Sequence, residues 1–239
     1  MALKLVTFDL DDTLWNPADA LVRAERVCYD WITERCPGIA DLYSREAMVQ
    51  YRKDLGLCYP QLAQQVSKLR EETLRRAAMQ AGLNRDDAAE LAQQAFEVFY
   101  RERSNLELFE ATLPLLQGLK ARLPVIAVTN GNADLELIGV DHLFDACITA
   151  DDVGIAKPAP DMFHAALQHA GVEPHECLHI GDHPHNDVHA ARVLGIHTVW
   201  TPLYQQSWPE ELEQPANQIS ELAELEALIE QLEQQLAGV

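Results

Sequence analysis

The chain contains 239 residues, and 48% of them are hydrophobic, which is enough apolar material to build a packed interior. Thirty-eight acidic side chains against eighteen basic ones give a formal net charge of -20, so the surface repels nucleic-acid backbones and excludes nucleic acid as a partner. A small anionic ligand must then be attracted locally, by a metal ion or by a few cationic groups.

Length and composition also restrict the domain organisation and the compartment. The chain is longer than a usual single domain but too short for two large domains. Its length therefore favours one core domain with a sizeable insertion. Nowhere do eighteen apolar residues follow one another, so we expect neither a signal peptide nor a membrane span. The cysteines are odd in number and lack paired spacing, which indicates reduced thiols of a cytoplasmic protein: Cys28, Cys36, Cys58, Cys147 and Cys177.

The first predicted element is a buried parallel strand within residues 3–10, an apolar run that leads into the sequence DLDDT at residues 9–13. Asp9 and Asp11 therefore leave the strand end close together. A carboxylate is a competent nucleophile towards phosphorus, and a neighbouring carboxyl group can protonate a departing alkoxide and later activate water. The alternative is a turn or a helix N-cap, where Asp and Thr are also favoured.

A long helical segment, residues 16–105, follows that strand and shows no convincing strand of its own. Apolar residues recur in it every three or four positions, so we interpret it as an inserted helical cap, although a separate helical domain would show the same pattern. Trp15 at its start and Tyr59 within it are candidates for stacking on a flat ligand ring; both could instead pack inside the protein.

Four further strands are predicted, and helical stretches separate them: residues 124–129, 147–149, 177–180 and 197–200. This alternation predicts an α/β fold, a doubly wound (Rossmann-like) parallel sheet core formed by residues 1–15 and 106–239. In such sheets ligands bind beyond the carboxyl ends of the strands.

Polar residues follow two of these later strands. Thr129, Asn130 and Gly131 offer a hydroxyl and backbone N–H groups that suit a phosphoryl oxygen, and Lys157 could neutralise its charge. A plain turn and a solvated surface lysine are the alternatives.

The strand ending at residue 180 continues into GDHPHND at residues 181–187. Asp182 and Asp187 suit Mg2+, a hard cation that takes one or two protein carboxylates, although Asp187 could instead cap a helix. Nearby histidines could bind a transition metal or touch a substrate, and these readings stay open: His183, His185 and His189.

The last predicted element is an acidic helix over residues 219–236 with one apolar side. It is expected to pack against its own core, and a short coiled coil between two copies is the alternative. The chain is therefore expected to be a monomer or a homodimer.

These strand-end motifs together resemble the haloacid dehalogenase (HAD) superfamily of phosphatases. The motif residues, in chain order, are Asp9, Asp11, Thr13, Thr129, Lys157, Asp182 and Asp187. The resemblance implies that Asp9 is the nucleophile and Asp11 the general acid and base. It also implies that Asp9, the Asp11 backbone carbonyl and Asp182 hold Mg2+, with Asp187 supporting a metal-bound water, while Thr129, Asn130 and Lys157 bind the phosphoryl group.

Three longer stretches resemble one branch of that superfamily: residues 8–15, 129–139 and 195–200. That branch dephosphorylates flavin mononucleotide and 5-amino-6-(5-phosphoribitylamino)uracil, so the resemblance implies a small phosphorylated metabolite as substrate. Sugar phosphates and nucleotides remain open as substrates. A dehalogenase, a phosphoaspartate signalling module and a catalytically silent binding protein are the competing functions.

Overall fold

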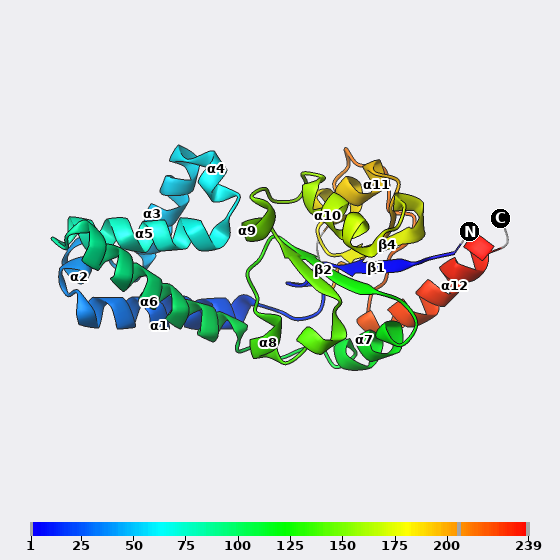
Figure 1. The fold of residues 1–239 in the computed structure, drawn as a ribbon, viewed down its shortest axis with the longest axis horizontal. Coiled ribbons are helices and arrows are strands. Elements are labelled where there is room, and N and C mark those ends of the chain that lie inside the picture. Colours follow the sequence, from blue (N-terminus) through cyan, green and yellow to red (C-terminus); the bar gives the residue numbers. More distant parts are fainter. Residues whose placement is uncertain (1, 205–206, 238–239) are drawn as a thin grey trace. The chain divides into compact units, whose positions relative to one another are not determined.

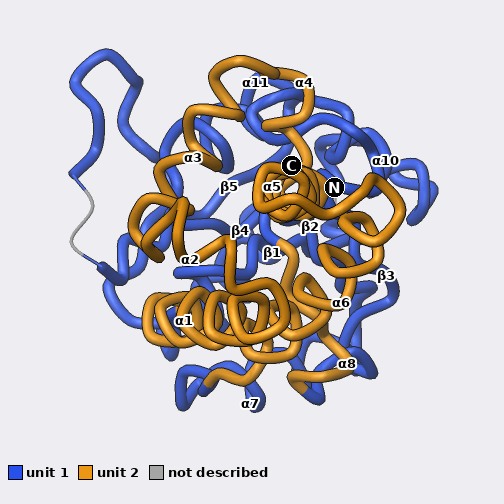
Figure 2. The backbone as a smooth tube through the Cα atoms, turned by 90° about the vertical axis from the view of Figure 1, so that its left-hand side faces the viewer, with its two compact units in different colours: residues 1–16, 107–131, 139–239 blue, residues 17–106, 132–138 orange. Residues whose placement is uncertain are grey.

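The computed structural model describes residues 2–204 and 207–237 and divides into two compact units (Figures 1 and 2). The core unit comprises residues 1–16, 107–131 and 139–239. The helical unit comprises residues 17–106 and 132–138; the sequence had assigned the second of these segments to the core.

The core unit contains one parallel sheet with strands where the apolar runs predict them. Within the described residues its strands are β1 (Leu5–Phe8), β2 (Val125–Thr129), β3 (Ala146–Thr149), β4 (Cys177–Gly181) and β5 (His197–Trp200). Their spatial order is β3-β2-β1-β4-β5, which confirms the predicted doubly wound α/β core. Such a sheet is covered on both faces, so its central strands read as continuous apolar runs rather than as alternating ones.

Helices cover both faces of this sheet. The core-unit helices are α7 (Thr112–Lys120), α9 (Ala150–Val153), α10 (Asp161–Ala170), α11 (Ala190–Val193) and α12 (Leu225–Ala237). Figure 1 shows α10 and α11 on one side of the sheet and α7 and α12 on the other. On the α10 side, Met162 and Phe163 pack with Leu5 and Ile126 in one buried cluster.

The register of the central strands brings their carboxyl ends to one edge. Phe8 pairs with Ala127 on one side and with Ile180 on the other, so Thr129 at the end of β2 lies at the same edge as Asp9 and Asp182, which follow β1 and β4. Parallel strands end at the same edge of a sheet, so this pairing gathers polar residues that lie far apart in the sequence.

The C-terminal helix starts later than the sequence predicts. The Ile219 N–H donates to the Trp200 carbonyl, and the Trp200 N–H donates to the Asn217 carbonyl, so this stretch is extended beside β5. A 3-10 turn at residues 222–224 then leads into α12, whose Leu225 and Ile229 are fully buried. The predicted apolar side is therefore correct for α12, but the prediction that the helix begins at Ile219 is wrong.

The helical unit consists of helices that follow one another with short turns, except the last, which comes after β2 in the chain. They are α1 (Ala18–Arg35), α2 (Gly38–Leu42), α3 (Arg45–Cys58), α4 (Pro60–Ala63), α5 (Val66–Gln80), α6 (Arg85–Ser104) and α8 (Leu135–Ile138). Small buried residues, such as Ala24 on α1 and Ala92 and Ala95 on α6, belong to one apolar cluster with Ile32 and Phe99. The Asn84 side chain accepts two backbone N–H bonds at the start of α6, a standard N-cap.

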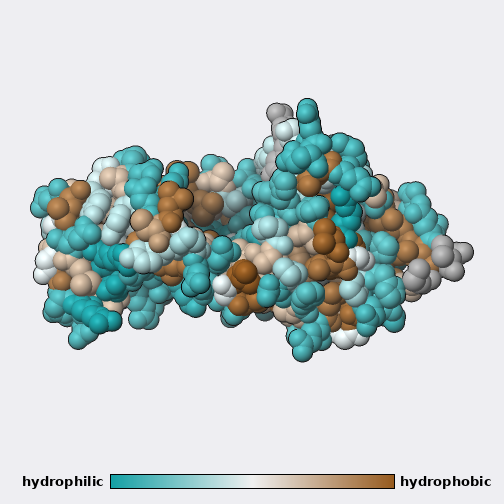
Figure 3. Space-filling model, turned by 90° about the horizontal axis from the view of Figure 1, so that it is seen from above, coloured by the Kyte–Doolittle hydropathy of each residue, from teal (hydrophilic) through white to brown (hydrophobic). Residues whose placement is uncertain are grey.

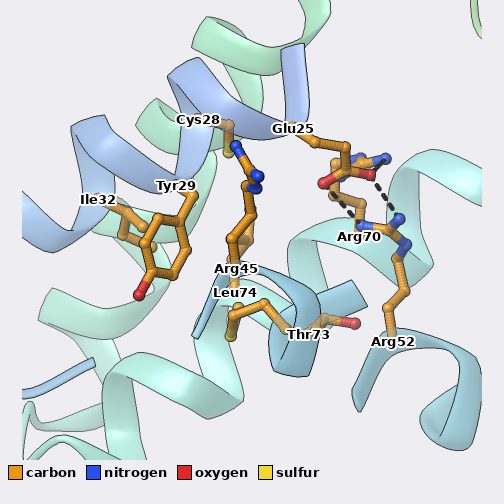
Figure 4. Close-up of a pocket in the computed structure, with 10 residues that line it drawn as sticks. Glu25, Cys28, Tyr29, Ile32, Arg45, Arg52, Arg70, Thr73 and Leu74 are labelled. Atoms are coloured by element: carbon orange, nitrogen blue, oxygen red, sulfur yellow. Dashed lines mark hydrogen bonds and ion pairs between the residues drawn. The ribbon is translucent and has the colours of Figure 1, made fainter. Parts of the chain in front are cut away.

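A partly buried ion cluster joins three helices of this unit (Figure 4). Glu25 on α1 accepts from Arg70 on α5 at 2.9 and 3.0 Å and from Arg52 on α3 at 2.5 Å. The Arg70 guanidinium lies 3.3 Å from the ring centroid of Phe99. Burial opposes ionisation of Glu25, but the bonds and charges of Arg70 and Arg52 outweigh it and lower the pKa of Glu25 from 4.5 to about 2.

The surface of each unit carries mainly hydrophilic side chains on the face seen in Figure 3, with hydrophobic residues in separate patches. Within the described part of the chain, none of the helices combines the length and the apolar composition needed to cross a membrane. All of the predicted reduced cysteines are free thiols.

We predict that Glu25→Gln lowers the free energy of unfolding at pH 7 by about 3 kcal/mol, because glutamine cannot supply the carboxylate whose depressed pKa stabilises the fold. A depressed folded-state pKa stabilises the fold above the unfolded value. The advantage of the wild type should therefore shrink as the pH falls from 4.5 towards 2.

Urea unfolding at several pH values measures this difference. Glu46→Gln, which removes a carboxylate from an exposed pair with Arg45, is the matched control and should leave the urea midpoint almost unchanged, because solvent screens this pair. Equal losses in the two variants, or a loss independent of pH, would contradict the assigned role of Glu25.

Candidate active site

Three buried carboxylates meet at the carboxyl edge of the sheet. Asp9 follows β1, Asp182 follows β4, and Asp187 lies in the π-helical turn at residues 184–189. One oxygen of each lies within 4.8 Å of the others. Asp9 and Asp187 are 178 residues apart in the sequence, and they meet because β1 and β4 are neighbours in the sheet.

The Lys157 ammonium bridges two of these carboxylates, those of Asp9 and Asp187. Its Nζ donates to Asp9 Oδ1 at 2.8 Å, to Asp187 Oδ1 at 2.5 Å and to the Val128 carbonyl at 2.6 Å. These three bonds use all three N–H groups of the ammonium. The side chain is almost fully buried, so the predicted lysine is not a solvated surface residue.

Asp187 is held on both of its oxygens. Oδ1 accepts from Lys157 and lies 3.2 Å from His179 Nε2, while Oδ2 accepts the His183 backbone N–H at 3.0 Å. Its carboxylate packs directly on Gly181, where an added Cβ would lie 2.5 Å from Asp187 Cγ. The glycine of the strand-end motif therefore makes room for this carboxylate.

The positive charge of Lys157 does not fully offset the effects of burial and of the neighbouring carboxylates on Asp9. Burial raises the pKa of Asp9 well above its ordinary value; Lys157 opposes that shift, and the neighbouring carboxylates Asp187 and Asp182 add to it. Burial also opposes ionisation of Asp187, but Lys157 and His179 hold the pKa of Asp187 well below its usual range. Asp187 and Asp9 together outweigh burial and raise the pKa of Lys157.

Three carboxylates against one ammonium leave two negative charges in a buried cluster. Oxygen donors at this spacing suit a hard divalent cation, which would offset that charge and favour the ionised form of Asp9. The donor set therefore fits a metal ion held by Asp9 and Asp182. Asp187 is the weaker candidate for direct coordination, because both of its oxygens already accept protein N–H groups.

The turn after β1 presents Asp11 beside this cluster. Asp12 adopts a left-handed conformation with φ of 61°, and its N–H donates to the Trp15 carbonyl, which closes the turn. The Trp15 indole N–H donates to Asp11 Oδ1 at 2.7 Å. Thr13 is fully buried and does not line the site pocket.

Neither aromatic residue singled out from the sequence is a free stacking surface. Trp15 is fully buried, in agreement with the packed alternative, and its indole N–H donates to Asp11. Tyr59 is exposed, but the Arg76 guanidinium lies 4.7 Å from its ring centroid.

The turn after β2 places Thr129 and Asn130 at the same edge. Thr129 Oγ1 accepts the Gly131 N–H at 3.0 Å. The Asn130 amide donates to the Lys157 carbonyl at 2.9 Å and accepts the Lys157 N–H at 2.7 Å. The Asn130 side chain thus clasps the Lys157 backbone, so it orients the lysine, whereas the sequence predicted that Asn130 binds phosphate.

These residues line one open pocket of about 250 Å3, which lies entirely within the core unit. Its lining includes Asp9, Asp11, Asp12, Thr129, Asn130, Gly131, Lys157, Asp182, His183, Asn186 and Asp187. The structure therefore brings together the residues predicted for catalysis, phosphate binding and metal binding, whereas Thr13, His185 and His189 lie outside the lining. A pocket lined by carboxylates, a lysine and strand-end backbone can hold a cation and a small anionic group side by side.

The predicted histidines His183 and His185 occupy different environments. His183 lines the pocket, and its Nδ1 accepts the backbone N–H groups of His185 and Asn186 at 3.2 Å, so it caps the following turn. His185 lies 3.4 Å from Glu211. Among the described residues, none of the three histidines belongs to the cluster of possible metal ligands.

Sequence reasoning missed His179 and the role of Trp15. His179 is a fully buried histidine inside β4, where an apolar residue is expected. A lone polar residue within an apolar strand was the available signal. Nothing in the sequence indicates the hydrogen bond from the Trp15 indole to Asp11. It depends on the conformation of a four-residue turn, which composition alone does not specify.

Comparison with known proteins places this site in context. A family model described as haloacid dehalogenase-like hydrolase matches residues 3–195. The 5-amino-6-(5-phospho-D-ribitylamino)uracil phosphatase YigB of Escherichia coli is 30% identical over 95% of this chain and 96% of its own. The phosphoserine phosphatase of Thermus thermophilus is 36% identical over 58% of this chain and 57% of its own.

Among solved structures, a protein described as 2-haloacid dehalogenase from Pseudomonas syringae superposes with a TM-score of 0.89. It is 34% identical, and the match covers 96% of this chain and 99% of that one. The relatives therefore carry both phosphatase and dehalogenase names.

We predict that Gly181→Ala lowers the free energy of unfolding by about 1–3 kcal/mol, because the new methyl group would overlap the buried Asp187 carboxylate. Gly118→Ala on α7 is the control, since its Cβ would meet only the end of the Glu226 side chain at 3.1 Å. Urea unfolding compares the two variants. A Gly181→Ala protein as stable as Gly118→Ala would show that Asp187 is not packed on Gly181.

Proposed function

Since the chain belongs to the haloacid dehalogenase-like hydrolases, we propose that it is a Mg2+-dependent phosphatase that cleaves a small phosphomonoester through an aspartyl-phosphate on Asp9. One observation carries the proposal. Asp9 and Asp182 lie within 4.8 Å of each other, and the Lys157 ammonium contacts Asp9 at 2.8 Å. A nucleophilic oxygen thus lies beside the positive charge that a phosphoryl group needs.

Asp9 is proposed to attack phosphorus. Its carboxylate oxygen forms a bond to phosphorus while the bond from phosphorus to the ester oxygen breaks. Asp11 donates a proton to that departing oxygen. In the second half, Asp11 takes a proton from water, the water oxygen bonds to phosphorus, and inorganic phosphate leaves with the Asp9 carboxylate restored.

The Thr129 hydroxyl is proposed to donate to a phosphoryl oxygen. Lys157 is proposed to supply positive charge beside it, with one of its three N–H groups turning from a protein acceptor to a phosphoryl oxygen when the substrate binds. Asn130 acts through the Lys157 backbone, which it holds with two hydrogen bonds. Trp15 holds the Asp11 carboxylate in the turn from which it reaches the leaving group.

Asp9, Asp182 and the backbone carbonyl of Asp11 are the proposed holders of Mg2+. When bound, the cation supplies the charge that offsets repulsion between a carboxylate nucleophile and an anionic substrate. The net charge of -20 makes such local compensation necessary, because the field of the whole chain opposes an anion.

Dehalogenation is the second candidate, favoured by the name of the Pseudomonas syringae structure. Displacing a halide also needs an aspartate nucleophile, but the leaving halide takes no proton and the reaction needs no cation. The placement of Asp11 and Asp182 in the same pocket as Asp9 supports the phosphatase. A phosphoaspartate signalling module is disfavoured because the chain belongs to a hydrolase family.

For the substrate, we propose the phosphate ester of a ribityl compound that carries a ring, such as flavin mononucleotide or 5-amino-6-(5-phosphoribitylamino)uracil. Support comes from the Escherichia coli relative, which matches along nearly the whole chain. The phosphate-binding residues cannot distinguish one ester from another, so we propose that the helical unit acts as a cap that sets selectivity. Sugar phosphates and nucleotides are the alternative substrates.

We predict that purified protein releases phosphate from flavin mononucleotide with a lower KM than from ribose 5-phosphate, and only with Mg2+ present. A panel of phosphate esters and 2-chloropropionate, assayed with Mg2+ and with EDTA, tests this. Chloride release that is insensitive to EDTA, without phosphate release, would overturn the phosphatase. Ribose 5-phosphate matching flavin mononucleotide would overturn only the substrate assignment.

We predict that Asp11→Asn slows hydrolysis of alkyl phosphates by about 10²- to 10⁴-fold, the usual contribution of general acid and base catalysis. Formation of the intermediate from p-nitrophenyl phosphate should suffer less, since that leaving group needs little protonation. Pre-steady-state release of nitrophenol separates this first step from the second. Equal losses of the first step for both ester types would argue against proton donation by Asp11.

A further inference from the structure

Two polar side chains face each other beneath the candidate active site, in the otherwise apolar middle of the sheet. Thr7 on β1 and His179 on β4 are register partners, and both are almost fully buried. Side chains alternate along a strand, so Thr7 lies on the same face as Asp9, and His179 on the same face as Gly181. The pair therefore forms the layer directly below the carboxylates.

Both ring nitrogens of His179 have partners. Nδ1 lies 2.9 Å from Thr7 Oγ1, and Nε2 lies 3.2 Å from Asp187 Oδ1. An ionised carboxylate only accepts, so Nε2 carries the proton and donates to Asp187, while Nδ1 is oriented by the Thr7 hydroxyl. The edge of the imidazole meets the Phe163 ring at a centroid distance of 4.8 Å and an interplanar angle of 89°. The ring is thus fixed from two sides.

Hydrogen bonds link this contact to Asp9, the proposed nucleophile. The Asp187 oxygen that faces His179 is the same one that accepts from Lys157 at 2.5 Å, and Lys157 in turn donates to Asp9 at 2.8 Å. A rotation of the Asp187 carboxylate would remove an acceptor from Lys157. The ammonium would then shift between its remaining acceptors, Asp9 and the Val128 carbonyl.

We propose that His179, oriented by Thr7, is a positioning residue that fixes Asp187 and, through Lys157, the Asp9 carboxylate. The inference deepens the proposed function and rests on it for its kinetic part. His179 does not itself line the pocket, and its contact with a residue that does is the one to Asp187, so it is proposed to act through Asp187. An apolar residue would fill the same interior position at lower desolvation cost, and the retained imidazole therefore serves its hydrogen bonds.

The test compares variants that keep or remove the donor. His179→Gln retains an N–H at the end of a side chain of similar reach, whereas His179→Leu removes it. Thr7→Val removes the hydroxyl behind the ring, and Thr7→Ser keeps it. Leu178→Val shortens an apolar side chain of the same strand and leaves in place the backbone carbonyl that lies 3.5 Å from Thr7 Oγ1, so it is the control for loss of packing.

We expect His179→Leu to lower kcat for p-nitrophenyl phosphate by about 10- to 100-fold, with KM changed less than about threefold. His179→Gln should recover most of that loss, and Thr7→Val should lower kcat more than Thr7→Ser. Leu178→Val should lower Tm without lowering kcat. In His179→Leu, the further change Thr7→Val should add nothing, since the ring it orients is gone.

Calorimetric titration with Mg2+ alone gives a readout that does not require turnover. We expect about tenfold weaker binding in His179→Leu than in the wild type, and near wild-type binding in His179→Gln. If the wild type hydrolyses no ester, the proposed function fails, while this titration still decides the positioning role. Equal Mg2+ affinity and kcat across the His179 variants, or losses in Gln and Leu that simply follow Tm, would overturn the proposal.

Discussion

The site depends on the hydrogen bonds and the positive charge of the Lys157 ammonium. This ammonium is the positive charge between Asp9 and Asp187, and its third N–H is fixed by the carbonyl of Val128 in β2. Two buried carboxylates would repel each other without it, and Asp182 adds a third negative charge nearby. The arrangement is stable because the fold holds each group in place: Asp9 by β1, Asp187 by Gly181 and the turn after β4, Lys157 by the Asn130 side chain.

The same charge balance explains why the site suits phosphate chemistry. One ammonium does not neutralise three carboxylates, so the cluster retains an affinity for a cation, and a cation together with Lys157 can accept an anionic phosphoryl group. The proposed phosphatase follows from this residual negative charge rather than from any single residue. Dehalogenation needs no cation, so it would not require this residual negative charge.

Much of the fold and most of the site could be predicted because they depend on local pattern. Short apolar runs predicted the strands of the described sheet, and parallel pairing then required Asp9, Thr129 and Asp182 to meet. The remaining features depend on contacts between separate segments of the chain, which local pattern does not encode. The Asn130 amide bonds a backbone 27 residues away, and the start of α12 is delayed because Ile219 pairs with Trp200. His179 was passed over because its partner, Thr7, lies 172 residues earlier.

The central claim is that Asp9 becomes covalently phosphorylated during turnover. Quenching the reaction of enzyme with p-nitrophenyl phosphate and Mg2+ in acid, reducing acyl phosphates with borohydride and sequencing the N-terminal peptide tests this most directly. The account predicts homoserine at position 9, dependent on substrate and absent from Asp9→Asn. Full turnover with an unmodified Asp9, or reduction of another carboxylate in its place, would contradict it.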